Sequence, residues 1–397
     1  MKRIKIQKDL ANVYFVSILT YLGCFITIDN NYFNGYNYIK LGCMLILLIY
    51  VIFYSRVMLN ARYLKTNFCF FILSLLIIIS SYVNNNYPYS SGNYLISGIN
   101  FIFTILLMLF TAEFASYKKQ MNALINMYYI LTICVVVLTD MFVFLDPNKS
   151  IIANDMYFIG TKFTVSYFHL FLIGFYVLKQ KSIKLKNIFF IFILCLIAIL
   201  ASIKVDCMTG IVGVFSFLII YVFFDKFSYI MTRPYIYVLT LIVSGLFVIF
   251  YSVIMRIGFV ENFLENVLHT STELTGRTWI YSILPLILSQ KMWLGNGFRS
   301  SFDVMMHTMH APNTQNGLTE WLLEGGILTT VAFLFFVWAV FKKVNYIGIE
   351  YKTNKMKVLY SMMYVLAILS TVEIMLNREI YFMWLLILFG FLNERKK

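Results

Sequence analysis

The residues best suited to chemistry are concentrated in residues 255–316, a segment between two long apolar runs. Arg277 stands there in the sequence TGRTW, where a turn leads into the apolar stretch Trp279–Leu288, which is too short to cross a membrane. Free N–H groups at a helix start bind anions, and a guanidinium adds a bidentate contact to phosphate. We therefore expect Arg277 to begin an interfacial helix and to hold a phosphate. The alternative is an arginine that only anchors the chain at lipid headgroups.

Two further motifs contain glycine. The sequence WLGNGF, Trp293–Phe298, has two glycines around an asparagine, which is typical of a tight turn. The sequence EGGI begins at Glu324, and Glu320 lies one helical turn earlier on the same face. Carboxylates at a helix start also stabilise its positive end, so a contact with substrate and a purely electrostatic role both stay open.

Two histidines precede the second of these motifs. His310 is suited to act as a general base near neutral pH, although a structural role is the commoner outcome for a single histidine. His307 lies three residues earlier, but no third ligand is close in sequence, so we predict no metal site. A run of polar residues follows and ends at Asn316, which we take as a candidate for substrate contact.

Several cationic residues lie outside the expected cytoplasmic loops. Five of them are candidates to converge on one outward cavity suited to a pyrophosphate: Lys162, Lys204, Arg256, Arg277 and Arg378. Arg299, directly after the WLGNGF turn, is a further candidate for substrate binding. The alternative is simple ion pairing at the interface, of Lys204 with Asp206 and of Arg378 with Glu373 or Glu379.

The elements that position these residues follow from composition. Hydrophobic residues make up 61% of the 397 and charged residues only 13%, against about 45–50% and about 25% in soluble domains. The apolar runs have the length of membrane-spanning helices, so we predict an all-α polytopic protein with about twelve spans. The expected spans are 10–28, 38–54, 67–83, 95–115, 123–145, 156–178, 187–203, 208–224, 235–254, 317–341, 357–376 and 379–393.

The placement of lysine and arginine predicts the orientation. If the spans alternate and both termini are cytoplasmic, every inside loop is basic, whereas the outside loops 29–37 and 84–94 contain no basic residue. The net charge of +14 is then mostly a topology signal, and no nucleic-acid partner is needed to explain it. The predicted organisation is a membrane domain of helices 1–9 (1–254), a large extracytoplasmic catalytic loop (255–316) and a membrane domain of helices 10–12 (317–397).

In this order and topological setting, the TGRTW, GNGF, Asn316-Gly317 and EGGI segments resemble the O-antigen ligase and Wzy-type polysaccharide polymerase family, which are GT-C-like membrane glycosyltransferases. The resemblance covers residues 275–327 closely. There are departures from the family pattern. Trp279 follows Arg277 by two positions rather than four. Gln315 stands where the family has histidine, and Met208 stands where it often has a basic residue. His310 and Lys204 are the substitutes that we expect.

The resemblance implies polymerisation of oligosaccharide repeat units carried by undecaprenyl pyrophosphate, with loss of the lipid pyrophosphate. Arg277 would hold the diphosphate and His310 would act on the acceptor hydroxyl, with no metal and no other cofactor. The implied partners are the lipid-linked oligosaccharide, membrane lipid and a chain-length regulator, in a bacterial cytoplasmic membrane. The alternatives are a ligase of the same family, which transfers a finished chain to lipid A core or protein, and a lipid-linked oligosaccharide flippase.

Overall fold

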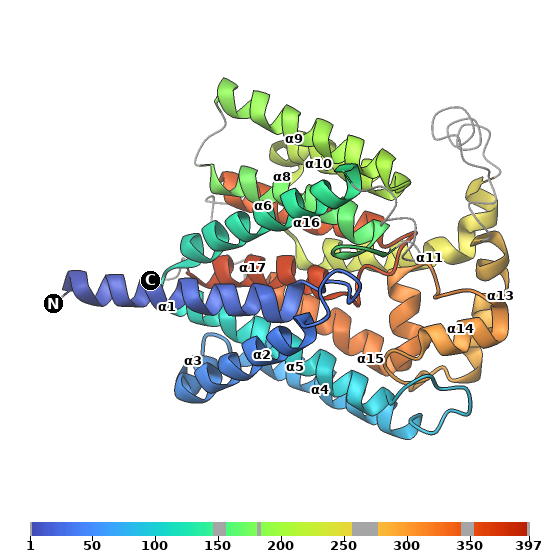
Figure 1. The fold of residues 1–397 in the computed structure, drawn as a ribbon. Coiled ribbons are helices and arrows are strands. Elements are labelled where there is room, and N and C mark those ends of the chain that lie inside the picture. Colours follow the sequence, from blue (N-terminus) through green and yellow to red (C-terminus); the bar gives the residue numbers. More distant parts are fainter. Residues whose placement is uncertain (1, 146–155, 181–183, 256–276, 343–352, 395–397) are drawn as a thin grey trace.

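The computed structural model describes residues 2–145, 156–180, 184–255, 277–342 and 353–394 (Figure 1). Helices dominate these residues, and two short strands pair as an antiparallel hairpin. The elements are α1 (Lys2–Thr20), η1 (Tyr21–Phe25), α2 (Tyr36–Phe53), α3 (Ser55–Met58), α4 (Leu64–Val83), α5 (Tyr94–Tyr117), α6 (Met121–Leu145), β1 (Met156–Tyr157), β2 (Gly160–Thr161), α8 (Lys162–Lys179), α9 (Leu185–Lys204), α10 (Met208–Met231), α11 (Pro234–Met255), α13 (Arg277–Gln290), α14 (Ser301–Met309), α15 (Gly317–Lys342), α16 (Asn354–Leu369) and α17 (Glu379–Glu394).

The apolar runs become helices. Each of the predicted segments coincides with a helix, and within the described residues eight helices are long and apolar enough to cross a membrane. These eight are α2, α4, α5, α6, α9, α10, α11 and α15. The chain is therefore an all-α polytopic membrane protein, as its composition predicts. The other predicted segments coincide with α1 and η1, α8, α16 and α17.

Two predicted boundaries are wrong. The expected span 156–178 begins with the β1–β2 hairpin, and its helix starts only at Lys162. The expected span 357–376 ends as a helix at Leu369, and the chain then runs without a helix as far as Glu379. A polar contact accounts for the second difference. Glu373 lies beyond the end of α16, where its carboxylate pairs with Arg277 of α13.

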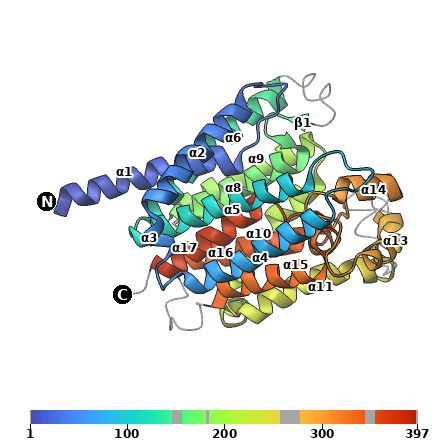
Figure 2. The same cartoon turned by 90° about the horizontal axis from the view of Figure 1, so that it is seen from below.

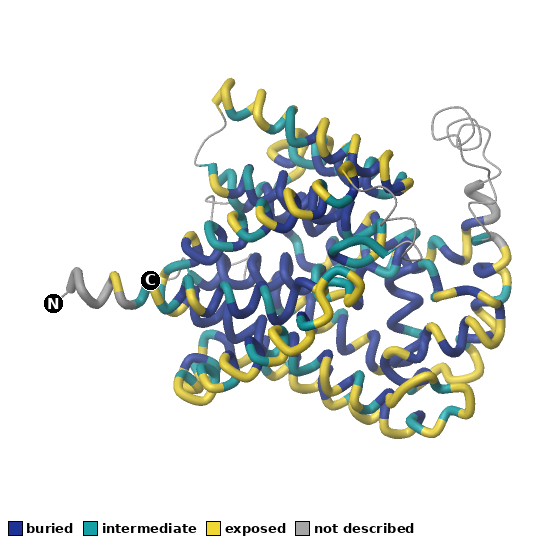
Figure 3. Tube along the Cα trace, in the orientation of Figure 1, coloured by how far each residue is buried: buried dark blue, intermediate teal, exposed yellow. Residues whose placement is uncertain are grey.

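The burial pattern is that of a protein surrounded by lipid. Large aromatic side chains point outward from the peripheral helices: Phe189 and Phe192 on α9 are 65% and 64% exposed, and Phe71 on α4 is 62% exposed. By contrast, α16 and α17 are buried along most of their length (Figure 3). Exposed apolar surface on this scale is costly in water and favourable in hydrocarbon.

The two ends of the bundle differ. Both ends of the chain lie at the same end of the bundle, and α13 and α14 lie at the opposite end (Figures 1 and 2). There α13 and α14 share an apolar cluster with α11 and α15, which includes Tyr251, Tyr281, Leu284, Met305 and Leu323. The described part of the predicted loop is thus packed onto the helices that flank it.

Candidate functional site

Arg277 is the first residue of α13 in the described part of the chain, and its side chain points into the protein. Its Nη2 donates to the Glu373 Oε1 at 3.1 Å, to the Val372 carbonyl oxygen at 3.1 Å and to the Gln315 Oε1 at 3.4 Å. The side chains of Arg277 and Glu373 are only 13% and 9% exposed. The Arg277 Nε is buried without a hydrogen-bond partner in the described structure. One guanidinium therefore ties α13 to the segment between α16 and α17.

Glu373 has an unusual protonation equilibrium because of this position. Burial raises the pKa of the Glu373 carboxyl from its ordinary value of 4.5 to about 7, although Arg277, Arg378 and Lys162 act in the opposite direction. Three of the cations that the sequence singles out are thus near one carboxylate. Near neutral pH this carboxylate is partly protonated, so the net charge of the cluster depends on pH.

A cavity of about 430 Å³ lies beside this cluster. Arg378, Arg299 and Lys40 line it, together with Glu373 and Glu379. Hydroxyl groups of the β2 and α8 region complete the polar part of the wall, from Thr161, Thr164 and Tyr167. We call it the cationic cavity. Cations that reach one hollow from α2, from the turn before α14 and from the start of α17 are suited to bind an anion of several charges.

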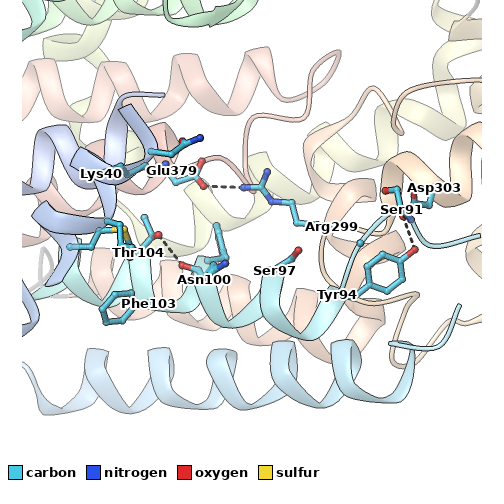
Figure 4. A pocket seen from close by; sticks show the side chains of 15 residues that line it. Lys40, Ser91, Tyr94, Ser97, Asn100, Phe103, Thr104, Arg299, Asp303 and Glu379 are labelled. Atoms are coloured by element: carbon cyan, nitrogen blue, oxygen red, sulfur yellow. Dashed lines mark hydrogen bonds and ion pairs between the residues drawn. The ribbon is translucent and has the colours of Figure 1, made fainter. Parts of the chain in front are cut away.

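A second cavity of about 650 Å³ adjoins the first (Figure 4). The two share three lining residues, Lys40, Arg299 and Glu379. At this boundary the Arg299 Nη2 donates to the Glu379 Oε1 at 3.0 Å, and the two side chains are 45% and 25% exposed. We call the larger hollow the neutral cavity, because most of its other lining side chains are uncharged: Asn37, Leu41, Met44, Ser91, Tyr94, Ser97, Asn100, Phe101, Phe103 and Thr104, with Asp303 as the exception.

The two glycine motifs pack directly against each other. Helix α15 breaks at Gly326, whose φ is +68° and ψ −173°. The break leaves backbone groups that the WLGNGF turn satisfies: the Asn296 N–H donates to the Leu323 carbonyl oxygen at 2.9 Å, and the Gly297 N–H to that of Glu324 at 2.8 Å. In return, the Ile327 N–H donates to the Met292 carbonyl oxygen at 2.8 Å.

Only glycine fits this junction. A Cβ on Gly326 would lie 2.3 Å from the Trp293 carbonyl oxygen, and one on Gly295 would lie 2.5 Å from the Gly326 nitrogen. Both residues also have positive φ, which side chains disfavour. Non-helical backbone within a membrane protein is tolerated where other protein groups satisfy it, as they do here. The junction fixes the chain just before Arg299, at the boundary of the two cavities.

Asn316 and Glu324 have contacts within the protein. The Asn316 Oδ1 accepts from the N–H groups of Leu318 and Thr319, both at 3.1 Å, and its Nδ2 donates to the Ser244 carbonyl oxygen at 2.7 Å. Asn316 thus caps the start of α15. Glu324 is buried, and its Oε2 accepts from the Asn377 Nδ2 at 3.4 Å. Neither residue lines the cationic or the neutral cavity.

The other predicted residues are dispersed. His310 is exposed at the end of α14 with a φ of +55°, and His307 stacks on Tyr89 with ring centroids 3.7 Å apart. Lys204 is exposed at the end of α9. None of these three lines either cavity. Arg256 lies outside the described residues.

The ion pairs that the sequence offered as the alternative to an anion site are not the pairs that form. Asp206 lies 3.8 Å from Lys162 rather than against Lys204, and Glu373 and Glu379 pair with Arg277 and Arg299 rather than with Arg378. Arg378 is exposed along the cationic cavity. Among the described residues, no group of three or more His, Cys, Asp or Glu side chains is placed to hold a metal ion.

Sequence comparison adds no assignment. No model of a known protein family matches the chain, and no functionally described protein matches it. The function is therefore inferred from the residues of the site and their geometry.

Proposed function

We propose that the protein is a membrane glycosyltransferase that polymerises undecaprenyl-pyrophosphate-linked oligosaccharide repeat units into a capsular, exopolysaccharide or O-antigen chain. The observation that carries the proposal is the cationic cavity. Arg378, Arg299 and Lys40 line it, and Arg277 and Lys162 lie close behind around Glu373. Arg277 and Arg299 are paired with Glu373 and Glu379, but among the described residues no carboxylate lies within ion-pair distance of Arg378 or Lys40. Cations gathered in this way are expensive in a protein with so few charged residues, and they indicate a binding site for an anion.

The chemistry of the reaction fits such a site. The acceptor hydroxyl oxygen bonds to the anomeric carbon of the donor sugar, and the bond from that carbon to the phosphate oxygen breaks. The lipid diphosphate leaves with the electron pair and so gains negative charge. Cations held in place before the reaction then stabilise the transition state more than the ground state.

The acceptor proton needs a base. By the family resemblance this is His310, whereas Glu373 and Glu379 are the carboxylates that line the cationic cavity. A general base contributes about 10²–10⁴-fold to the rate. We expect the base to be the residue whose neutral variant, His310→Ala, Glu373→Gln or Glu379→Gln, loses this factor while the donor still binds.

The membrane arrangement is part of the proposal. We infer twelve crossings of a bacterial cytoplasmic membrane with both termini in the cytoplasm. Three facts support this: the coincidence of all the predicted segments with helices, the position of both chain ends at one end of the bundle, and the basic inside loops. The cavities then open toward the extracytoplasmic side, where lipid-linked repeat units are presented.

The test is reconstitution of the purified protein in liposomes with lipid-linked repeat units and electrophoresis of the products. We expect a ladder of chain lengths from the wild type. Arg378→Ala should reduce chain formation at least about tenfold, because one charge contact to the diphosphate is lost. Lys186→Ala is the matched control, since Lys186 is an exposed cation of α9 away from both cavities.

The same assay separates the rival functions. A wild-type protein that moves repeat units across the liposome membrane without joining them is a flippase, and the proposal then fails. In cells, loss of a polymerase leaves single repeat units, whereas loss of a ligase leaves long unattached chains. Accumulation of long chains in the Arg378→Ala strain would therefore favour the ligase.

A further inference from the structure

The neutral cavity contains a feature that the diphosphate site does not explain. Ser97, Asn100 and Thr104 of α5 line it at spacings of three and four residues, so they share one helix face. Asn100 is exposed although α5 is one of the helices able to cross a membrane. A polar side chain presented to hydrocarbon is costly. Ile96 and Ile99 of the same helix are 56% and 48% exposed and do not line the cavity.

The rest of the lining also provides fixed hydrogen-bonding groups. The Asp303 Oδ2 accepts from the Tyr94 hydroxyl at 2.8 Å and from the Ser91 N–H at 3.1 Å. Asn37 of α2 adds a further amide to the wall. Figure 4 shows Ser97 and Asn100 pointing toward the space below Arg299, with Asp303 and Tyr94 at one end of it.

This lining selects among ligands. An anionic headgroup would meet the carboxylate of Asp303 away from the boundary cations. A hydrocarbon tail would match Leu41, Met44, Phe101 and Phe103 but would leave the amides and hydroxyls of the wall without hydrogen-bond partners. A neutral sugar offers hydroxyl groups to amides, hydroxyls and a carboxylate, and an apolar ring face to aromatic side chains such as Phe103. The volume of about 650 Å³ is in the range of small-molecule sites.

We infer that the neutral cavity is the subsite for the uncharged sugars of the acceptor oligosaccharide, which hydrogen-bond to Ser97, Asn100 and Thr104 of α5. The Arg299–Glu379 pair separates this subsite from the diphosphate site. The assignment rests on the proposed function, because it needs a donor diphosphate in the adjoining cavity. The acceptor hydroxyl and the donor anomeric carbon then meet where the cavities share Lys40, Arg299 and Glu379.

Binding without lipid tests this subsite directly. The probe is the oligosaccharide released by mild acid from the lipid-linked repeat unit, and saturation-transfer NMR on the protein in nanodiscs measures its binding. We expect Asn100→Leu to weaken binding about tenfold, since one amide contact is lost, and Ser97→Trp to abolish it by filling the cavity. The matched control is Ile99→Leu, since Ile99 is an exposed residue of α5 that does not line the cavity, and this variant should bind like wild type. Binding of undecaprenyl pyrophosphate should be unchanged in all three.

The outcomes separate this inference from the proposed function. If the wild type makes polymer, but Asn100→Leu and Ser97→Trp bind the oligosaccharide as the wild type does, the subsite assignment is wrong and the function stands. If the oligosaccharide binds and the stripe variants lose it, yet the wild type joins no repeat units, the subsite stands and the polymerase function fails. Loss of lipid binding rather than sugar binding in Asn100→Leu would show a lipid groove and overturn the inference.

Discussion

The pairs Arg277–Glu373 and Arg299–Glu379 have almost the same length, 3.1 and 3.0 Å, but different surroundings. The first is buried beneath the cationic cavity, whereas the second stands half-exposed between the two cavities. A buried pair holds elements together and is costly to break, while an exposed pair contributes little to stability and opens easily. The buried pair therefore holds α13 to the segment before α17, whereas the exposed pair can open at little cost, as the proposed binding of a substrate anion would require.

The largest effect on polymer formation is expected from Arg277→Ala, which should abolish polymer while the protein still inserts in the membrane. It should also lower the free energy of unfolding by about 2 kcal/mol, because Glu373 is left buried without its partner. The double variant Arg277→Ala/Glu373→Ala should recover most of that stability and none of the polymer. Chain length and unfolding in detergent measure the two effects. Wild-type chain lengths from the single variant would refute the assignment of Arg277.

A change at the α15 break should disrupt the junction that holds the chain just before the exposed pair. Gly326→Ala places a Cβ against the Trp293 carbonyl oxygen at a positive φ, so we expect a loss of about 4 kcal/mol in the free energy of unfolding. Gly42→Ala is the control, since nothing lies within 4 Å of its added Cβ, and it should be neutral or slightly stabilising. Equal stability of the two variants would show that the junction does not hold the chain before Arg299.

The carboxyl of the buried pair should make stability depend on pH. The pKa of Glu373 is about 7 in the folded protein, above its ordinary value of 4.5, so the folded state binds more protons between these values. Stability contributed by this group is therefore greatest below pH 4.5 and falls by about 3 kcal/mol as pH rises to 7. Glu373→Gln should remove this part of the slope, whereas Glu379→Gln should not. Parallel pH profiles for wild type and Glu373→Gln would contradict the raised pKa.

The smallest effect on stability is expected from Arg299→Ala. Its pair with Glu379 is half-exposed, so the cost should be under about 1 kcal/mol. Chain formation should nevertheless fall, because Arg299 lines both cavities. Unfolding and product ladders measured on the same preparation check this separation. A stability loss as large as that of Arg277→Ala would remove the distinction between the two pairs.

The sequence predicted the helices well because each apolar run is long and specifies its own helix. It also identified Arg277, Arg299 and Arg378 as site candidates. It could not predict that Glu373 is the partner of Arg277, because the two residues are 96 positions apart and no local pattern links them. Lys40 lies within one of the expected spans, and only the folded structure places it in the cavity walls with Glu379.

Two polar features show how much a sequence pattern leaves open. Asn316 is a candidate for substrate contact in the sequence, and an asparagine just before an apolar run is equally the signal of a helix cap, which its hydrogen bonds in the structure form. The sequence analysis missed the polar stripe of α5, Ser97, Asn100 and Thr104, because apolar residues between them keep the mean hydropathy of the run high. A search of each apolar run for polar residues on one helix face, in place of its mean hydropathy, would have found the stripe.

The junction at Gly326 also constrains how the chain can vary. Four backbone hydrogen bonds tie residues 292–297 to residues 323–328 in a fixed order. Inserting or deleting one residue between Met292 and Phe298 would shift every donor past its acceptor and turn Arg299 away from the boundary. Related chains should therefore conserve the length of this stretch and its glycines, and should tolerate substitutions at its other positions.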